Sequence, residues 1–352
     1  MNNIELSVII PVYNTEKYFN KCINSVLDAL KKLNKKNEII VINDGSKGNI
    51  KELIKEYLEK YPNVITFVSQ DNKGRGATRN KGIELSRGKY INFIDSDDYI
   101  DENMYLKMFE RMRKDSSDIV LCDFENIDFE NPEKNGVLEA KSKNINDIKW
   151  GIFNELVVPS CCNKIIKKEL FEGLSFPEDI NYEDLATIPV LILKANKISY
   201  IDEMLYKYVQ NGDSVMHEEF GITQLNLINA LEIVCSRINE LSNLSTDEKE
   251  KAIYMISTRR YYEKILEKII LADNKEILAK EFLSKIKFLE NMLYNNRYFR
   301  KQISIQGLKK EVGNKLLHKT IQRNSFALLK KLLNKKIYYN FIAIRYTNVE
   351  IN

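Results

Sequence analysis

The chain of 352 residues is longer than the roughly 100–200 residues of a typical single domain, so we expect one large domain with an appendage, or two domains. Its 44% hydrophobic and 30% charged residues are typical of a soluble globular protein and exclude a disordered or fibrous chain. The formal net charge is only +4, but the last part of the chain is rich in Lys and Arg.

The cysteines indicate a reducing compartment. They are odd in number, form no CxxC pair and mostly sit in apolar runs, where a thiol behaves as a small hydrophobe. The five are Cys22, Cys122, Cys161, Cys162 and Cys235. A zinc site is not expected, because the histidines His217 and His318 lie near no cysteine pair.

The sequence also favours a cytoplasmic location. The first apolar run, Leu6–Ile10, is stopped by Pro11 and is too short for the core of a signal peptide. No stretch approaches the ~20 apolar residues needed to cross a bilayer.

The first 125 residues alternate short β-branched runs with longer amphipathic runs, which predicts βαβ units with helices on the faces of a sheet. The predicted strands read as nearly continuous apolar stretches, so we expect a mostly parallel sheet that is buried on both faces. These strands are Ser7–Val12, Glu38–Asn43, Val64–Ser69, Tyr90–Ile94 and Ile119–Phe124. The helices between them are Lys17–Leu33, Ile50–Tyr61, Arg75–Ser86 and Asn103–Lys114.

The pattern weakens between residues 126 and 144, where we expect a loop or a surface hairpin. Helices are then predicted at Ile145–Glu155, Lys164–Gly173 and Leu185–Ala195, and a strand at Lys197–Ile201. After Glu218 the pattern predicts successive amphipathic helices at Gln224–Leu241, Thr246–Leu271 and Lys275–Asn295. We therefore divide the chain into a domain of residues 1–218 and a helical region of residues 219–352.

Polar residues follow several of the predicted strands, at the edge where open α/β sheets bind ligands. The second strand ends in Asp44, beside a glycine that allows a sharp turn; an ordinary turn explains that motif equally well. After the third strand, glycines precede a helix that carries Arg79. The free backbone N–H groups in the first turn of a helix favour anions. A plain loop with a solvated Arg79 is the alternative for the second motif.

The fourth strand ends in an acidic cluster of Asp95, Ser96, Asp97 and Asp98. Alternation along a strand places the carboxylates of Asp95 and Asp97 on one face, where they repel each other unless a cation neutralises them. Oxygen ligands suit Mg²⁺ or Mn²⁺. The alternative is a surface turn that ends in an N-capping Asp98.

A second acidic pair, Glu183 and Asp184, begins a later apolar helix. Acids in the first turn of a helix complement the helix dipole without any catalytic purpose, so the pair alone predicts no function.

Taken together, these motifs resemble the family 2 glycosyltransferases, inverting enzymes of the GT-A fold that are common in bacterial capsule, O-antigen and teichoic-acid synthesis. The matching segments are SVIIPVYN, EIIVINDGS, NKGRGATRNKGIELSRGKYINFIDSDD, CNKIIKKELFEGLSFPEDINYEDL and IDEMLYKY. They occur in the family's order and spacing across residues 4–217.

The resemblance implies a role for each motif. Asp184 matches the proposed catalytic base, and Asp97 matches the direct metal ligand. Asp95 is expected to contact the metal, the ribose or the donor sugar. Asp44 is expected to hydrogen-bond the base, usually uracil. The full set of implied donor-binding residues is Pro11, Tyr13, Asp44, Arg79, Asp95, Ser96 and Glu183.

The expected chemistry is a single displacement at the anomeric carbon. The acceptor hydroxyl loses its proton to a carboxylate as it attacks. A bound Mn²⁺ or Mg²⁺ stabilises the charge on the leaving nucleoside diphosphate. The implied partners are a nucleotide-sugar donor, with a UDP-sugar favoured, and a hydroxyl of a glycan or lipid-linked acceptor. Inversion gives a β-linked product from an α-linked UDP-hexose.

The sequence departs from the family's pattern at Cys162 and at Val209, Gln210 and Asn211, which stand where relatives often carry Arg after the Tyr-rich segment. Cys162 stands where many relatives have Trp before the Asn-Lys pair, which predicts different stacking of the acceptor or donor sugar. His217 lies where a flexible lid closes in relatives. One interpretation is that its side chain contacts the metal or a phosphate. A structural role is the commoner reading of a lone histidine.

Between Arg297 and Arg345 basic residues alternate with leucines, and Glu311 is the only acid. A basic amphipathic helix favours an anionic membrane surface, so we expect peripheral contact with the inner face of the plasma membrane; a solvated helical face is the alternative. No recognition motif supports nucleic-acid binding.

Two other functions compete with the transferase. A non-catalytic membrane partner in a polysaccharide assembly complex would not need both Asp97 and Asp184. A nucleotidyltransferase would need a glycine-rich loop after the first strand, where Pro11 and Tyr13 stand instead.

Overall fold

The structure is a computed structural model of the whole chain. It describes residues 4–131, 135–137, 148–151, 158–210, 223–257 and 295–298, with single residues or pairs at 133, 221, 268, 277–278, 281–282, 285 and 292. The predicted helix Lys275–Asn295 and the basic segment after Arg297 lie almost entirely outside these residues, and His217 lies outside them too.

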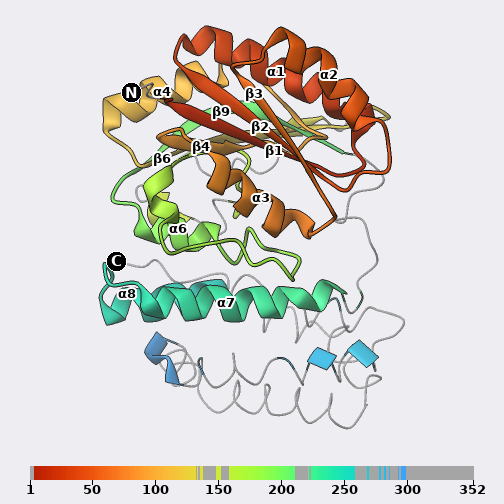
Figure 1. The fold of residues 1–352 in the computed structure, drawn as a ribbon. Helices are drawn as coiled ribbons and strands as arrows, with labels where there is room; N and C mark the ends of the chain where they lie inside the picture. The colour runs from red at the N-terminus through yellow and green to blue at the C-terminus, as the bar shows by residue number, and fades with distance from the viewer. Residues whose placement is uncertain are drawn as a thin grey trace. The chain divides into compact units, whose positions relative to one another are not determined.

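The described residues form one mixed sheet whose strands run in the order β3-β2-β1-β4-β8-β6-β9-β5, with β7 paired to β6 (Figure 1). Its N-terminal half is parallel, as the sequence predicts: β1 pairs with β2 and β4, and β2 pairs with β3. These strands are β1 (Leu6–Val12), β2 (Asn37–Asp44), β3 (Ile65–Gln70) and β4 (Tyr90–Phe93).

The other half of the sheet is mostly antiparallel, so the prediction of a mostly parallel sheet is wrong there. Strand β8 runs antiparallel to both β4 and β6, and β5 runs antiparallel to β9, whereas β6 and β9 are parallel. The strands concerned are β5 (Tyr99–Ile100), β6 (Ile119–Ile127), β7 (Gly136–Val137), β8 (Lys164–Lys167) and β9 (Ile198–Val209).

Strand β8 corrects the predicted helix at Lys164–Gly173. The segment forms a strand followed by a short 3-10 helix, η3 (Lys168–Phe171). Ile165 and Ile166 are fully buried, because β8 is hydrogen-bonded on both sides and covered on both faces of the sheet. β-Branched residues such as isoleucine pack well in a strand that is buried on both faces. The local sequence pattern alone also fits a helix, so the pairing with neighbouring strands decides the structure.

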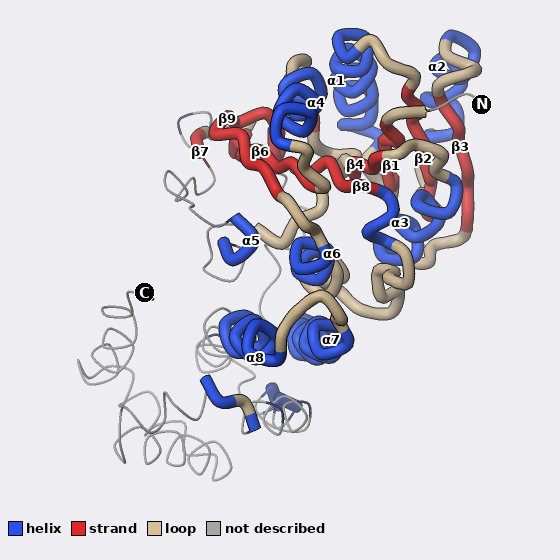
Figure 2. Tube along the Cα trace, turned by 90° about the vertical axis from the view of Figure 1, so that its left-hand side faces the viewer, coloured by secondary structure: helices blue, strands red, loops and turns tan. Residues whose placement is uncertain are grey.

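Helices cover both faces of the sheet. Figure 2 shows α1 (Glu16–Leu33) and α4 (Met104–Asp115) on one face, and α3 (Gly74–Leu85) and α6 (Ile188–Lys194) on the other. Helix α2 (Ile50–Lys60) packs beside the edge strand β3. The buried side of α1 contains Phe19, Ile23, Val26 and Leu30, which recur at helical spacing.

Helix α6 begins three residues later than the predicted helix Leu185–Ala195. Pro189 explains this start, because proline is tolerated in the first turn of a helix, where its missing N–H would have no partner. The residues before it, including Glu183 and Asp184, form a turn instead. The predicted hairpin after residue 126 is confirmed in its described part, where β7 pairs with β6.

The chain divides into two compact units. The first contains residues 1–218 and 233–244; the second contains residues 219–232 and 245–352. Helix α7 (Asn226–Glu240) agrees with the predicted helix Gln224–Leu241, and its second half belongs to the first unit. There Arg237 donates to the carbonyls of Ala186 and Ser175.

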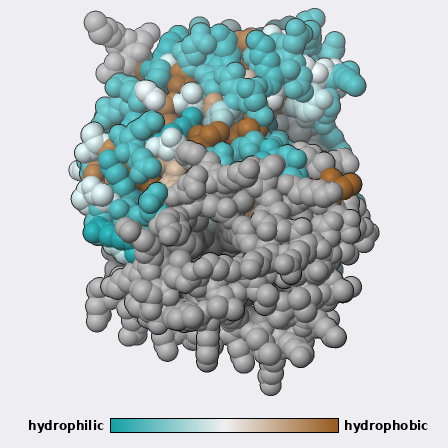
Figure 3. Space-filling model, turned by 90° about the horizontal axis from the view of Figure 1, so that it is seen from below, coloured by the Kyte–Doolittle hydropathy of each residue, from teal (hydrophilic) through white to brown (hydrophobic). Residues whose placement is uncertain are grey.

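In the second unit, α8 (Thr246–Tyr254) begins at a capping box formed by Ser245 and Glu248. Within the described residues, no helix combines the length and apolar character needed to cross a membrane. The described surface visible in Figure 3 is mainly hydrophilic, with small scattered hydrophobic areas.

Candidate active site

The candidate site lies at the carboxyl ends of the parallel strands. Because β1, β2 and β4 run in the same direction, the loops after them meet at one edge of the sheet. After β4 the chain turns at once: the N–H of Asp98 donates to the carbonyl of Asp95 at 3.0 Å. The Oγ atoms of Ser96 and Thr15 lie 2.6 Å apart, which joins this turn to the loop after β1.

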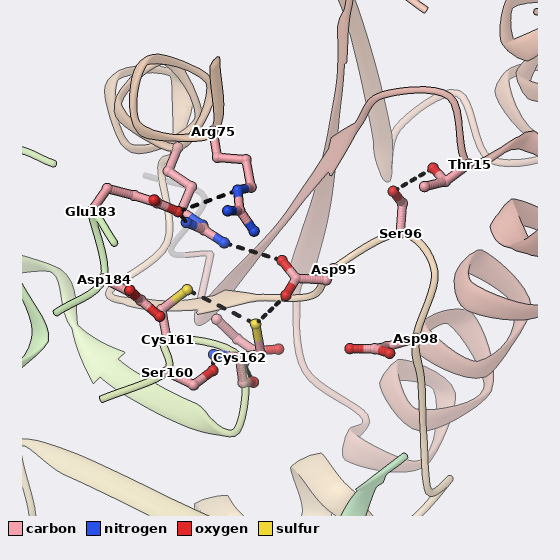
Figure 4. Close-up of polar contacts among 12 residues, drawn as sticks. Thr15, Arg75, Asp95, Ser96, Asp98, Ser160, Cys161, Cys162, Glu183 and Asp184 are labelled. Carbon is pink, nitrogen blue, oxygen red and sulfur yellow. Dashed lines mark hydrogen bonds and ion pairs between the residues drawn. The ribbon is translucent and has the colours of Figure 1, made fainter. Parts of the chain in front are cut away.

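A buried arginine links two of the predicted acidic motifs. The guanidinium of Arg79, which is only 3% exposed, pairs with Glu183 through Nη1 and with Asp95 through Nη2, the latter at 3.1 Å. The carboxylate of Asp95 is held on both sides, by this guanidinium on Oδ1 and by the sulfur of Cys162 on Oδ2, and Figure 4 shows the contact with Cys162. The plane of Arg79 also lies 5.6 Å from the centre of the Phe176 ring. Helix α3, the loop after β4 and the turn before α6 therefore share one cation.

The charges of this network explain why its carboxylates stay ionised although they are buried. Burial alone raises the pKa of Asp95, but Arg79, the Cys162 thiol and Arg75 together lower it below the ordinary value. Burial likewise opposes ionisation of Glu183, and the charges of Arg79 and Arg75 bring its pKa below the ordinary value. At neutral pH both carboxylates are negative.

Asp184 has the opposite electrostatic environment. Burial and the negative charge of Glu183 raise the pKa of Asp184 to about 6, against the opposing effect of Arg79. Its Oδ1 accepts a hydrogen bond from the N–H of Leu185 at 2.7 Å. The turn that carries Glu183 and Asp184 begins after Tyr182, which has a φ of 67°. A carboxylate with a pKa near neutrality can accept a proton at physiological pH and release it again.

Asp98 has a structural role. Its carboxylate accepts hydrogen bonds from the hydroxyl of Tyr206 at 2.7 Å and from the N–H of Val209 at 2.8 Å. The same Tyr206 hydroxyl accepts a hydrogen bond from the N–H of Asp95 at 3.3 Å. Burial and the charges of Asp97 and Asp95 raise the pKa of Asp98 well above its ordinary value. Asp98 thus attaches the acidic loop to strand β9.

Asp44 holds the loop before α3. One of its oxygens accepts from the N–H of Lys73 at 2.9 Å and from Gln70 at 2.8 Å, and the other accepts from the N–H of Gly74 at 2.9 Å. Gly45 makes the turn after it, with a φ of 77°, and its backbone lies against Asn72. The predicted turn and the predicted glycine loop are therefore one unit.

The start of α3 packs directly on the segment before Glu183. A Cβ atom on Gly76 would lie 2.0 Å from the carbonyl oxygen of Pro177, so only glycine fits there. Asn80 donates to the carbonyl of Phe176 and accepts from its N–H, both at 2.8 Å. This contact brings Arg79 and Glu183 together.

The remaining predicted donor-binding residues lie after β1. Tyr13 is 47% exposed, and Pro11 is half-buried near the end of the strand. The N–H of Asn14 donates to Ser46 at 3.0 Å, which joins the loops after β1 and β2. An exposed aromatic ring at this edge is suited to stack on a flat ligand group.

Two residues of this region were not predicted as site residues. Cys162, which is buried, donates from Sγ to Oδ2 of Asp95 at 2.9 Å. The fully buried Lys164 donates to the carbonyls of Ser160 at 2.6 Å and Val158 at 3.0 Å, and to Oδ1 of Asn163 at 2.7 Å. Burial lowers the pKa of Lys164 to about 8. The one signal in the sequence was the departure of Cys162 from the family's tryptophan.

The predicted metal ligands fit a divalent cation that takes its other ligands from the substrate. Asp97 is half-buried after the strand end, and its carboxylate is a hard oxygen donor. Within the described residues, no cluster of three or more His, Cys, Asp or Glu side chains could enclose a metal. Mg²⁺ is commonly held by one or two carboxylates together with substrate phosphates, which is the donor set that this site offers.

The fold agrees with that of solved structures. The chain superimposes on residues 1–349 of TarS from S. aureus in complex with UDP-GlcNAc with a TM-score of 0.66, covering 83% of each chain at 21% identity. The fold is therefore that of the GT-A glycosyltransferases.

Sequence comparison finds a similar family and several similar proteins. Residues 7–174 match the family model "Glycosyl transferase family 2". The chain is 28% identical to the glycosyltransferase GlyG of Streptococcus pneumoniae over 77% of this chain and 92% of that protein. It is 29% identical to the minor teichoic acid biosynthesis protein GgaB of Bacillus subtilis over 61% of this chain, but it spans only 24% of GgaB. Residues 7–174 are thus similar to glycosyl transferase family 2.

Proposed function

We propose that this protein transfers a sugar from a UDP-sugar to a hydroxyl group of a bacterial surface polymer or its lipid-linked precursor, with inversion at the anomeric carbon. The observation that carries the proposal is Asp184, a partly buried carboxylate with a pKa of about 6 beside the Arg79 network. Such a group is suited to general-base chemistry near neutral pH.

Each charged group has a separate part in the proposed transfer. Asp184 accepts the proton of the acceptor hydroxyl as that oxygen attacks the anomeric carbon. Arg79 binds Glu183 through Nη1 and Asp95 through Nη2, so it orders the carboxylates instead of transferring a proton. Tyr13 stacks on the base of the donor, and Asp44 keeps the loop around the nucleotide in shape.

We propose Mn²⁺ or Mg²⁺ as the cofactor, with Asp97 as its protein ligand and Asp95 as a second one. A divalent cation there supplies stabilisation of the negative charge on the departing diphosphate. The support is the hard oxygen donors at the strand end and the ionised state of Asp95.

The relatives support the class of donor and acceptor. The solved TarS complexes contain UDP-GlcNAc and UDP, and GgaB is named for the synthesis of a minor teichoic acid. UDP-GlcNAc is therefore the first donor to test, and polyol-phosphate polymers and lipid-linked glycans are the first acceptors. A single displacement from an α-linked donor yields a β-linked product.

The transferase activity is tested by incubating the protein with UDP-, GDP- and dTDP-sugars, Mn²⁺ and these acceptors, and by measuring release of the nucleotide. The variant Asp184→Asn should lose at least about 10²-fold in kcat while it binds the donor normally. Asp202→Asn is the matched control, because Asp202 is an exposed aspartate on β9. Absence of turnover with every donor and acceptor would favour the non-catalytic partner.

The cofactor is tested separately. EDTA should stop turnover, and added Mn²⁺ should restore it. Asp97→Ala should weaken the metal-dependent binding of UDP-GlcNAc, measured by calorimetry. Asp98→Asn should instead lower the stability of the fold, because Asp98 accepts hydrogen bonds from Tyr206 and Val209. Turnover that persists unchanged in EDTA would rule out the metal.

We further propose that the basic segment after Arg297 attaches the protein to the inner face of the plasma membrane. Its Lys and Arg residues alternate with leucines, as in helices that bind anionic lipid. In a flotation experiment with vesicles that contain anionic lipid, the full chain should rise with the vesicles. A chain truncated after Lys301 should stay in the lower fraction.

A further inference from the structure

Two adjacent cysteines stand beside the donor-site carboxylate Asp95. Cys161 and Cys162 are both buried, and their sulfur atoms lie 3.9 Å apart. The two differ in their contacts: Cys162 donates to Oδ2 of Asp95 at 2.9 Å, on the carboxylate oxygen opposite the one that Arg79 binds. Figure 4 shows the sulfur of Cys162 directed at Asp95.

The backbone that carries Cys162 is firmly anchored. The fully buried amide of Asn92 donates to the carbonyl of Cys162 at 2.9 Å and to that of Lys164 at 2.8 Å. The ammonium group of Lys164 binds the carbonyls of Ser160 and Val158 ahead of it. The thiol therefore projects from a segment that is fixed to the strands on either side of β8.

The side chain of Cys162 offers a hydrogen-bond donor, because a thiol carries an S–H group. A protonated thiol is a weak donor to a neutral group, but a carboxylate acceptor strengthens the bond.

We propose that Cys162 is a positioning residue of the donor site, whose thiol fixes the orientation of the Asp95 carboxylate. With Arg79 on one oxygen and Cys162 on the other, the plane of the carboxylate cannot turn. Without the thiol, Asp95 keeps its charge partner but gains freedom to rotate about its side-chain bonds. This role rests on the proposed function, because it assumes that Asp95 contacts the donor.

The kinetic test compares three substitutions at position 162. Cys162→Ala and Cys162→Val remove the donor, and they should raise the KM for UDP-GlcNAc about tenfold, the size expected for losing a hydrogen bond to a charged group, with a smaller change in kcat. Cys162→Ser retains a donor and should stay within about threefold of the wild type. Cys161→Ala is the matched control and should leave the KM unchanged.

The size of the side chain must be separated from its hydrogen bond. Val fills more volume than Cys, and Ala fills less, so a packing effect would arise from a clash in one variant and from a cavity in the other, and the two losses would differ in size. Equal loss in the Ala and Val variants with rescue by Ser supports the hydrogen bond. If the Ser variant is as weak as the Ala variant, or if Cys161→Ala raises the KM equally, the proposal is wrong.

A spectroscopic test does not depend on the transferase activity. The S–H stretching band of Cys162, isolated as the infrared difference between the wild type and Cys162→Ala, should lie at the low frequency of a strongly bonded thiol. The substitution Asp95→Asn should move that band toward the frequency of a free thiol. A band that is unaffected by Asp95→Asn would overturn the positioning role, whereas absence of turnover with a shifted band would overturn only the proposed function.

Discussion

Arg79 and Glu183 form a buried ion pair across 104 residues of sequence, and both side chains are almost inaccessible to solvent. The same guanidinium reaches Asp95, so the pair also determines where the acidic loop after β4 lies. One cation thus joins three segments that carry the candidate chemistry.

Replacing this cation should disrupt both stability and activity. Arg79→Met leaves Glu183 as a buried carboxylate whose remaining cation is the more exposed Arg75, 3.7 Å away. We expect a loss of roughly 3 kcal/mol in the free energy of unfolding. Urea denaturation followed by circular dichroism measures this change. Lys81→Met on the exposed side of the same helix is the control and should change that free energy by less than about 0.5 kcal/mol. An Arg79→Met variant as stable as the wild type would contradict the prediction that the ion pair with Glu183 stabilises the fold.

The pH dependence of transfer should follow Asp184. Because the pKa of this carboxyl is raised to about 6, the base is ionised above that pH, and kcat should fall tenfold per unit as the pH drops below 6. The pH–rate profile between pH 5 and 8 checks this limb. A limb near pH 4, the ordinary value for an aspartate, would mean that a different group limits the rate.

The same raised pKa has a consequence for stability with the opposite sign. The pKa of Asp184 is higher in the folded than in the unfolded chain, so this carboxyl favours the fold at low pH and that contribution is lost as the pH rises through about 6. We therefore expect Asp184→Asn to be more stable than the wild type at pH 7.5, by on the order of 1 kcal/mol. Thermal unfolding at pH 4.5 and 7.5 measures the difference, which should shrink at the lower pH.

Gly76 should tolerate no side chain. A Cβ atom would collide with the carbonyl of Pro177, so Gly76→Ala should push α3 away from the segment that carries Glu183 and cost more than about 2 kcal/mol, despite the better helix propensity of alanine. Gly136→Ala is the matched control, because no atom lies within 4 Å of its added Cβ. Similar unfolding curves for the two variants would contradict the close packing.

Lys164 should make stability depend on alkaline pH. Its pKa of about 8 in the folded protein lies below the unfolded value of roughly 10.4, so the unfolded chain binds more protons between these values. The free energy of unfolding should consequently gain a positive slope between pH 8 and 10, and this slope should be absent from Lys164→Met. Chemical denaturation of both proteins across that range tests the expectation, and parallel curves would refute it.

The sequence predicted those parts of the molecule that have a regular local pattern. Strands β1 to β4 and helices α1 to α4 agree with their predicted ranges to within a few residues, because apolar spacing alone distinguishes them. The motifs around Asp44, Arg79 and Asp95 were located by their place after strands, and the structure brings those around Arg79, Asp95 and Glu183 together.

What the sequence could not predict depends on contacts between distant segments. Strand β8 has only four residues, and its neighbours on both sides decide that it is a strand. The bond from Cys162 to Asp95 spans 67 residues, and nothing local distinguishes this thiol from that of Cys161. The structural role of Asp98 in the acidic cluster likewise depends on its hydrogen bonds with Tyr206 and Val209, more than 100 residues away.

The central place of β8 also determines the order in which a newly made chain can complete its sheet. Strands β4 and β6 each pair with β8, so a chain still emerging from the ribosome that ends before Lys164 has a gap between them. Open strand edges bind other chains and aggregate. Chains stalled before Lys164 should therefore need chaperones, and those released after Lys167 should need them less.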